Sequence, residues 1–487
     1  MKNPFPWKNL SLLRTVIRLS VLTMILFLPQ ACVTGQGGYS RDLGKAVLGN
    51  QGYLSLFLNL KEKNSPAVGM ELQQIDIRTQ DGRWLPLSNA PIHLHTDNIK
   101  DAQIFLLRSK LNPGYYSQIR LSPGGAWLGG VQQDHNDIMV SRQAVEIRLP
   151  DPLYIGRGDS QSVFLTWDVR RSLNNSERFT PYLSAAPKLK NMIVDVAYVA
   201  CPDIQTVFMI RTDKNWVFDS LGIQGRPTFL ASSALYPSTS LFALVPDQQK
   251  IVKISPAANR VIESFNLSIT GNPSHMALSP DGTMAYIIDQ ARGNILRMDL
   301  RSGHIEKRNR LGHSPSYILY LPKQKLLAVS LSRSQNVVLV DPDTLSPVQS
   351  ISTSTRPEGL MVWNDTMLYI AESGANSVLV YDLINSRENK RITVDFTPRR
   401  ILSAGGFIYV SNYNSKSISR LSPGQLGVGR TVPLDGRPLE MAYDARNRWI
   451  YVGNADQNTL DIIDPSTGKS AGRIELGSRP LGIRVVN

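Results

Sequence analysis

Arginine residues stand directly before prolines at regular intervals along the C-terminal part of this 487-residue chain. The planar guanidinium group of arginine binds carboxylate or phosphate through two parallel hydrogen bonds. If the turns that carry these residues converge at one end of the fold, they form a rim that captures anions. The arginines before prolines are Arg226, Arg356, Arg437 and Arg479, and the pair Arg399 and Arg400 follows a further proline of the series.

Three other polar residues lie just after prolines of the same series and would belong to this rim: His275, Glu358 and Glu440. The two glutamates could pair with some of the arginines. A structural interpretation is equally open, in which arginine–glutamate and arginine–carbonyl contacts close the centre of the fold. The sequence thus predicts where a partner would bind, and it leaves both interpretations of the arginines standing.

A second candidate site lies nearer the N-terminus, where His93 and His95 are two residues apart. On a strand this spacing places both imidazoles on one side, so that with Asp97 they could hold one metal ion. The alternative is a solvent-facing strand beside a loop. We favour this alternative, because two histidines at this spacing are an unspecific signal, and we expect no metal site.

The elements that would position the rim are visible in the spacing of the prolines. Successive members are 46, 42, 42, 41, 40 and 42 residues apart, by subtraction of their residue numbers. A period in the low forties with several short strands per repeat predicts a β-propeller. The prolines are Pro227, Pro273, Pro315, Pro357, Pro398, Pro438 and Pro480.

One repeat illustrates the unit, because residues 438–480 contain four short apolar strands separated by turns rich in Asp, Asn, Gly and Pro. The segments Tyr409-Val-Ser-Asn412 and Tyr451-Val-Gly-Asn454, with the Gly-x-x-Pro closures, resemble the YVTN family of seven-bladed β-propellers. The resemblance covers residues 195–487. It implies a seven-bladed ring, and it implies little about activity, because that family includes surface and binding proteins as well as enzyme-like relatives.

The two ends of the repeat array predict how the ring closes. The array begins with strands at 194–199 and 206–210 that correspond to the second and third strands of a repeat. After Pro480 only one first strand remains. We therefore expect the C-terminal strand to complete the first blade, which closes the ring and removes open sheet edges.

Catalytic motifs are absent from the sequence. It contains no Gly-x-Ser-x-Gly, His-Glu-x-x-His or Cys-x-x-Cys-His motif, and the predicted rim is rich in arginine where a calcium-dependent lactonase-like propeller needs acidic residues. The repeat also lacks the tryptophan docking motif of quinoprotein propellers. We expect a binding or scaffold protein with no catalytic residue or cofactor. The alternatives are a propeller hydrolase or lactonase-like enzyme and a structural surface or adhesion protein.

The N-terminus predicts export. Four basic residues precede the apolar run 19–28, and Cys32 follows, so residues 1–31 are expected to be a signal peptide. A cysteine at the cleavage point resembles a bacterial lipoprotein, in which Cys32 is acylated. By resemblance to enterobacterial sorting rules, Val33 then implies an outer-membrane lipoprotein on the periplasmic or surface face. Ordinary secretion and a retained anchor are the alternatives.

The segment between the signal peptide and the repeats divides into three parts. Residues 32–50 are rich in Gly, Ser and Gln and are expected to form a flexible tether. Residues 51–185 show alternating apolar runs that predict a β-sandwich of seven or eight strands. They also resemble an uncharacterised β-sandwich domain of bacterial lipoproteins through Pro113-Gly-Tyr-Tyr-Ser-Gln-Ile-Arg120. Residues 186–194 form a short linker to the propeller at 195–487.

Charge and cysteine content limit the partners. The net charge is +14, and removal of the signal peptide with its four Lys and Arg leaves 49 − 39 = +10. This excess suits an acidic envelope protein, an acidic polysaccharide or a small anionic ligand, although a generally basic surface explains it as well. No dense Lys/Arg run is present, and nucleic acid is not expected as a partner. Cys201 ends an apolar strand and is expected to be a buried, unreactive thiol.

Overall fold

The computed structural model of the chain describes residues 50–88, 90–100, 102–130, 136–141, 143–173, 178–186, 195–233, 239–267, 271–425 and 427–486. All of them belong to one compact unit, Lys45–Asn487. The predicted signal peptide, the lipidation site Cys32 and nearly all of the tether lie outside the described residues. The described chain is all-β, and none of its helices is long and apolar enough to span a membrane.

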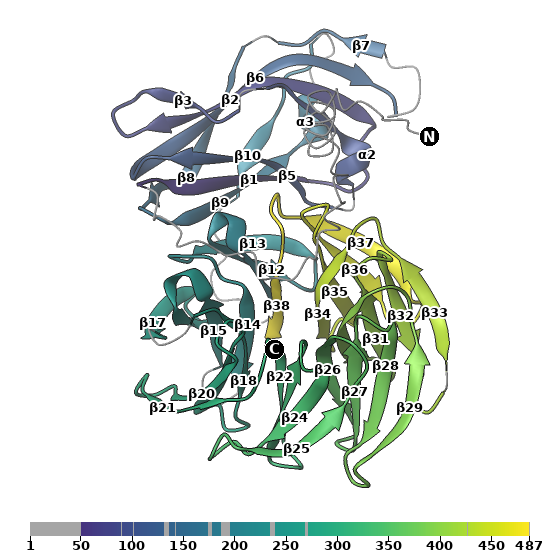
Figure 1. Cartoon of the computed structure of the whole chain (residues 1–487). Coiled ribbons are helices and arrows are strands. Elements are labelled where there is room, and N and C mark those ends of the chain that lie inside the picture. The colour runs from purple at the N-terminus through teal and green to yellow at the C-terminus, as the bar shows by residue number, and fades with distance from the viewer. Residues whose placement is uncertain are drawn as a thin grey trace, which may run out of the picture. The chain divides into compact units, whose positions relative to one another are not determined.

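The N-terminal region, residues 50–186, contains two sheets (Figure 1). The first has the order β10-β9-β1-β5, and the second has the order β3-β2-β6-β7 with β4 paired to β2 and β8 paired to β6. The described residues of this region thus form ten strands, whereas the sequence predicted seven or eight, because three-residue strands such as β3 are too short to show a period. The strands are β1 (Gly52–Leu60), β2 (Val68–Thr79), β3 (Trp84–Pro86), β4 (Ile92–His95), β5 (Ile104–Leu111), β6 (Gly114–Leu128), β7 (Asn136–Ile138), β8 (Val145–Ile155), β9 (Ser160–Trp167) and β10 (Leu183–Ala185), with the one-turn helices α2 (Thr96–Ile99) and α3 (Val169–Ser172).

The repeat region, residues 195–486, is a series of four-stranded antiparallel sheets. Its first half has the sheets β13-β12-β11-β38, β14 to β17, β18 to β21 and β22 to β25. The strands are β11 (Val196–Cys201), β12 (Thr206–Arg211), β13 (Trp216–Gly222), β14 (Phe229–Ser233), β15 (Ser240–Val245), β16 (Lys250–Ser255), β17 (Arg260–Asn266), β18 (Pro273–Leu278), β19 (Met284–Asp289), β20 (Asn294–Asp299), β21 (Ile305–Arg310), β22 (Pro315–Leu321), β23 (Leu326–Leu331), β24 (Asn336–Val340) and β25 (Pro347–Ser352), with the 3₁₀ turns η1 (Pro202–Ile204) and η2 (Pro246–Gln248).

The remaining sheets run β26 to β29, β30 to β33 and β34 to β37 in sequence order. Each begins at a proline of the periodic series, because proline has no N–H to pair and suits the first residue of a strand. The strands are β26 (Pro357–Trp363), β27 (Met367–Glu372), β28 (Ser377–Asp382), β29 (Arg387–Thr393), β30 (Pro398–Ala404), β31 (Phe407–Asn412), β32 (Ser417–Leu421), β33 (Val428–Pro433), β34 (Pro438–Asp444), β35 (Trp449–Asn454), β36 (Thr459–Asp464), β37 (Lys469–Glu475) and β38 (Gly482–Val486).

The first strands of the sheets contact one another in a closed circuit. Successive contacts join β14, β18, β22, β26, β30, β34 and β38, and β38 also contacts β14. In Figure 1 these strands turn toward a common centre, where β38 lies. The C-terminal strand β38 pairs antiparallel with β11, from Val196↔Val486 to Ala200↔Gly482. This is the arrangement that the two ends of the repeat array predict, and it gives a propeller-like ring.

In two of the sheets a carboxylate at the end of the second strand fixes the turn before the first strand. Asp289, which ends β19, accepts hydrogen bonds from the backbone N–H groups of Gly271 at 2.7 Å and Asn272 at 2.9 Å. Glu372, which ends β27, accepts one from the N–H of Ser354 at 2.7 Å. These bonds satisfy turn donors that the sheets cannot reach. Asp289 and Glu372 therefore have a structural role in these turns.

The N-terminal region packs on the repeat region through one face of β1, β5 and β9. Phe57 stacks on Phe164 with ring centroids 5.6 Å apart and meets Phe208 of β12 edge-on at 6.0 Å. Arg108 donates to the carbonyl oxygens of Leu476 and Gly477, both at 3.1 Å, in the turn that leads into β38. The contact thus falls where the first and last sheets of the repeat region meet.

Candidate functional site

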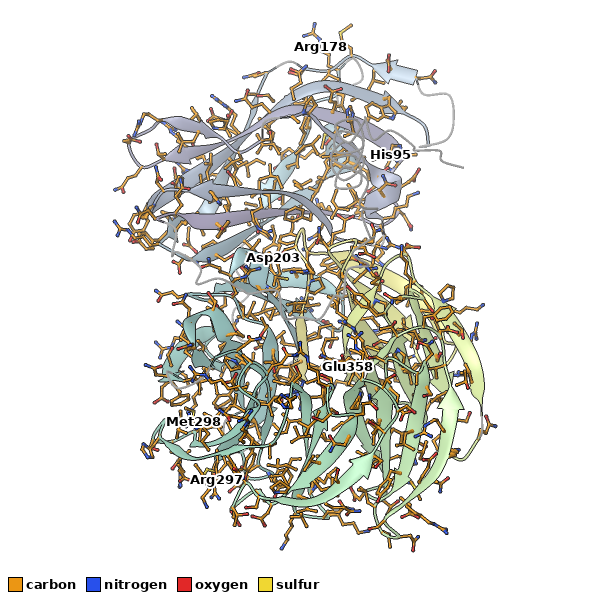
Figure 2. The ribbon with its side chains drawn as sticks, viewed as in Figure 1. His95, Arg178, Asp203, Arg297, Met298 and Glu358 are labelled. Atoms are coloured by element: carbon orange, nitrogen blue, oxygen red, sulfur yellow. The ribbon has the colours of Figure 1, made fainter. Side chains whose placement is uncertain are left out.

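Two of the arginines that precede prolines share a single carboxylate. The Nη2 of Arg226 lies 2.5 Å from Oδ1 of Asp203, and the Nη2 of Arg479 lies 3.4 Å from Oδ2 of the same residue. Asp203 belongs to the turn between β11 and β12, so the turns before β14 and β38 converge on it; Figure 2 labels it. One carboxylate therefore serves both guanidinium groups, and it offsets one of their two charges.

A third arginine of the series is also paired. Arg437 donates from Nε to Oδ1 of Asp456 at 2.8 Å, and its own backbone N–H donates to Oδ2 at 3.0 Å. Its guanidinium carbon lies 5.2 Å from the ring centroid of Tyr413, while that of Arg399 lies 4.2 Å from the same ring. Arg399 is 5% exposed, so Tyr413 is held between one buried and one half-exposed cation.

Arg356 differs from these three. It is exposed, with a left-handed φ of 57°, and it has no ion-pair partner among the residues that the structure describes. Arg333, in the turn between β23 and β24, is likewise exposed and has no such partner in the described part of the chain. His313, in the turn before β22, is exposed as well.

Backbone hydrogen bonds hold these three residues on neighbouring turns. Ser332, next to Arg333, donates from N to the carbonyl of Ser314 at 3.1 Å, and Thr353 donates to the carbonyl of Gln335 at 3.0 Å. The turn with Arg333 is therefore tied to the turn with His313 and to the start of the turn with Arg356. We call His313, Arg333 and Arg356 the basic edge. The proline series does not mark His313 or Arg333. Strand alternation does place the turn after every second strand at the same sheet end as the turn before every first strand, and this signal points to Arg333.

The residues two positions after the prolines form a separate group where the first strands meet. Phe229 and His275 have ring centroids 3.7 Å apart, and His275 and Tyr317 have centroids 4.1 Å apart. The guanidinium carbon of Arg400 lies 5.1 Å from the Tyr317 ring centroid, and its Nε donates to Oε2 of Glu440 at 2.9 Å. We call Phe229, His275, Tyr317, Arg400 and Glu440 the axial cluster. It is aromatic on one side and ionic on the other.

A glycine allows Arg400 to reach across to Tyr317. Gly359 occupies the position equivalent to the cluster residues on β26, and a Cβ there would lie 2.4 Å from the carbonyl oxygen of Arg399 and 3.0 Å from the Cα of Arg400. Glu358, the preceding residue, has Oε2 3.9 Å from Nη1 of Arg400. Figure 2 shows Glu358 among the converging first strands. The structure thus brings His275, Glu358, Arg400 and Glu440 together, whereas Arg356 lies apart on the exposed basic edge.

Burial governs the titration of the two polar aromatic members of the axial cluster. Desolvation, with a smaller contribution from the charge of Arg400, holds the pKa of His275 well below its usual value. Desolvation also raises the pKa of Tyr317, and the charge of Glu440 adds to the rise. His275 is therefore neutral and Tyr317 keeps its proton at physiological pH. Both side chains can donate a hydrogen bond without carrying charge.

The histidine pair near the N-terminus does not share one surface. The side chain of His93 is 66% exposed, and its Nδ1 lies 3.9 Å from Oε2 of Glu71. His95 is 5% exposed, with Nε2 2.8 Å from the carbonyl of Gly129 and Nδ1 accepting from the N–H of Asp97 at 3.1 Å. Both ring nitrogens of His95 thus have partners in the fold. Across the described ranges no group of three His, Cys, Asp or Glu residues could hold a metal ion.

Cys201 lies inside the contact between the first and last sheets of the repeat region. It is fully buried, and this burial raises the pKa of its thiol to about 12. A thiol that keeps its proton and has no exposed surface is a poor nucleophile.

No family model matches the chain, and no curated protein matches its sequence. Among solved structures, the chain is similar to a functionally unknown protein from Desulfotomaculum acetoxidans DSM 771, with a TM-score of 0.54 and 14% identity over 60% of this chain and 99% of that one. It is also similar to hydrazine synthase of Kuenenia stuttgartiensis, with a TM-score of 0.46 and 17% identity over 54% of this chain and 95% of that one. The third is dihydro-heme d1 dehydrogenase NirN in complex with DHE, with a TM-score of 0.47 and 13% identity over 60% of this chain and 66% of that one. The first likeness indicates the fold alone, and with the four-stranded sheets it identifies the repeat region as a β-propeller type of structure.

Proposed function

We propose that this protein is an envelope-anchored binding protein whose basic edge docks an acidic partner. In this proposal the repeat region is a seven-bladed propeller of the YVTN type, residues 51–185 are a β-sandwich, and Cys32 carries a lipid anchor. The observation that supports docking is the contrast among the arginines. Arg226, Arg437 and Arg479 are paired with aspartates, while Arg333 and Arg356 are exposed cations with no acidic partner among the described residues.

Charge explains why an acidic partner fits this surface. Exposed, unpaired cations attract negative surfaces over about a Debye length, roughly 8 Å at physiological ionic strength. Arg356 and Arg333 also offer guanidinium groups that have no hydrogen-bond partner among the described residues, so they can bind carboxylates in a bidentate manner. Arginine is enriched among the residues that dominate binding energy at protein interfaces.

The test is affinity capture from intact bacterial envelopes after crosslinking. The wild-type chain is compared with the double variant Arg333→Glu/Arg356→Glu, which should lose a captured acidic protein or polysaccharide. The matched control is Lys323→Glu/Lys325→Glu. Both lysines are exposed in the turn between β22 and β23, which lies at the sheet end opposite to the basic edge. Lys325 has a φ of 53°, close to that of Arg356, so the backbone cost of the two changes is similar.

Two outcomes would count against the proposal. The same catch from the wild type and the Arg333→Glu/Arg356→Glu variant would exclude the basic edge as the docking surface. A protein that stays in the soluble fraction with Cys32 intact would exclude the anchor. With the anchor present, Cys32→Ser should release the chain from the membrane fraction while leaving its melting temperature unchanged.

A further inference from the structure

Several buried polar groups beside the axial cluster have no hydrogen-bond partner. Both ring nitrogens of His275 are unpartnered although the residue is only 3% exposed, and the hydroxyls of Thr228 and Ser274 are also buried and unpartnered. Buried polar groups in proteins are nearly always bonded, and exceptions call for a bound molecule or another specific cause. Thr228 and Ser274 each precede a residue of the axial cluster in the sequence, Phe229 and His275 respectively.

Arg484 of β38 adds an uncompensated charge at the same place. Its Nε donates to the hydroxyl of Ser232 at 2.8 Å, and among the described residues it has no carboxylate within ion-pair distance. Its side chain keeps solvent-accessible surface, while burial by the surrounding protein lowers its pKa. The guanidinium of Arg484 is therefore open to solvent at a place where neighbouring protein atoms also surround it.

Tyr317 links Arg484 to the orphan groups. The charge of Arg484 acts on the Tyr317 hydroxyl, and the Tyr317 ring lies 4.1 Å from the ring of His275. Ser232 is on β14, the strand that supplies Phe229 to the axial cluster. Arg484, Tyr317 and His275 are therefore neighbours across three first strands, and none of them has a described acceptor for its remaining donors.

The balance of charge defines the class of molecule that this place would accept. Arg400 is compensated by Glu440 at 2.9 Å and by Glu358 at 3.9 Å, whereas Arg484 is not compensated. The available groups are donors: a guanidinium, a phenol, an imidazole N–H and small hydroxyls. Among the described residues Arg484 has no carboxylate within ion-pair distance, so its guanidinium can pair with one carboxylate of a ligand. The rings of Phe229 and Tyr317 offer apolar contact.

We propose that the axial cluster with Arg484 binds a small monocarboxylate that has an apolar body. The carboxylate pairs with the Arg484 guanidinium and accepts a hydrogen bond from the Tyr317 hydroxyl, with His275 and Ser274 as neutral donors beside it. Phe229 and the Tyr317 ring contact the apolar body. This site is separate from the basic edge and does not depend on a docked partner.

The test is titration of the purified protein with benzoate in chloride buffer, followed by calorimetry and by the melting temperature. Benzoate should bind saturably and raise the melting temperature, and benzamide, which has the same shape without the charge, should do neither. Arg484→Gln should weaken benzoate binding at least tenfold, and Tyr317→Phe about fivefold, because each removes a donor to the anion. Arg260→Gln, which changes an exposed arginine on the outer strand β17, should have no effect.

A direct readout comes from the imidazole nitrogens of His275, whose NMR signals are assigned with a His275→Gln variant. Benzoate should shift these signals in the wild type. If Arg484→Gln does not fold, benzoate binding to Tyr317→Phe is the test of the site, because this substitution removes only the hydroxyl group. Benzoate should still bind to the Arg333→Glu/Arg356→Glu variant, which separates this site from the docking surface.

Three results would overturn the inference. The first is that none of benzoate, acetate and cyclohexanecarboxylate binds saturably at concentrations up to about 10 mM. A dissociation constant above this concentration corresponds to too little binding free energy to indicate a site. The second is equal binding of benzamide and benzoate. The third is benzoate binding that is unchanged in both Arg484→Gln and Tyr317→Phe, which would place the anion elsewhere on the protein.

Discussion

Arg400 and Glu440, on neighbouring first strands, form an ion pair with Nε 2.9 Å from Oε2, and each side chain is 13% exposed. Partial burial makes this pair costly to break, because either partner alone would leave a charge poorly solvated. The pair also holds Arg400 beside Tyr317, at 5.1 Å from the ring centroid. It therefore determines the arrangement of the ionic side of the axial cluster.

Removal of one partner of this pair should destabilise the protein. We expect Glu440→Ala to lower the free energy of unfolding by about 3 kcal/mol, because Arg400 loses its closest carboxylate and keeps only the weaker contact with Glu358 at 3.9 Å. The double variant Arg400→Met/Glu440→Leu should recover part of this loss, since the close ion pair is replaced by apolar side chains and only Glu358 loses a partner, at 3.9 Å. Denaturant titration of the two variants and the wild type measures both effects. A double variant that is less stable than Glu440→Ala would contradict this account.

Gly359 should not tolerate a side chain. In Gly359→Ala the new Cβ would lie 2.4 Å from the carbonyl oxygen of Arg399, which is rigid backbone of the next sheet. Relief of this clash should cost about 2 kcal/mol of unfolding free energy. Gly125→Ala is the matched control, because Gly125 is also in a strand and a Cβ there would meet no atom within 4 Å. Equal melting temperatures for the two variants would show that the strands can separate without cost.

Stability should fall in mild acid because of His275. The pKa of this histidine is well below its usual value in the folded protein, where desolvation and Arg400 oppose its charge. Below pH about 6.5 the unfolded chain gains a proton that the folded chain does not, so stability declines as pH falls, by at most about 1.4 kcal/mol per pH unit. Melting temperatures between pH 7 and 5 should drop less steeply for His275→Gln than for the wild type. His93→Gln, at an exposed position, controls for loss of any histidine, and identical slopes for all three proteins would refute the assignment.

Loss of the C-terminal strand should open the ring. β38 pairs with β11 and contacts both β34 and β14, and it buries Ile483, which is 5% exposed. A chain that ends at Arg479 should melt about 10 °C lower than the full chain, since several kcal/mol of apolar burial is lost with the pairing. Limited proteolysis should then cut the repeat region at low protease concentration. A chain lacking only Asn487 is the control, and unchanged melting of the longer truncation would exclude a closing role for β38.

Parts of the candidate site were predictable because they repeat. Proline periodicity and strand alternation place Phe229, His275, Tyr317, Arg400 and Glu440 at one equivalent position of successive units, so their convergence follows from the register. The pairing of Arg226 and Arg479 with Asp203 was not predictable, because Asp203 lies in a turn of the first sheet and Arg479 precedes the last strand of the chain. Arg333 was also missed, since its turn carries no proline to mark it.

The sequence by itself determined the all-β class, the repeat, the strands that begin at or just after the periodic prolines, and the set of arginines placed at the turns. These features depend on local chemistry: hydrophobic alternation, the missing N–H of proline and the turn preference of Gly, Asn and Asp. Only the tertiary structure decided which arginines remain exposed, and that Gly359 lets Arg400 reach Tyr317. The exposure of each arginine and the contact of Arg400 with Tyr317 depend on residues that are tens to hundreds of positions apart in the sequence. They also depend on burial, which sets the desolvation free energy of each charged side chain.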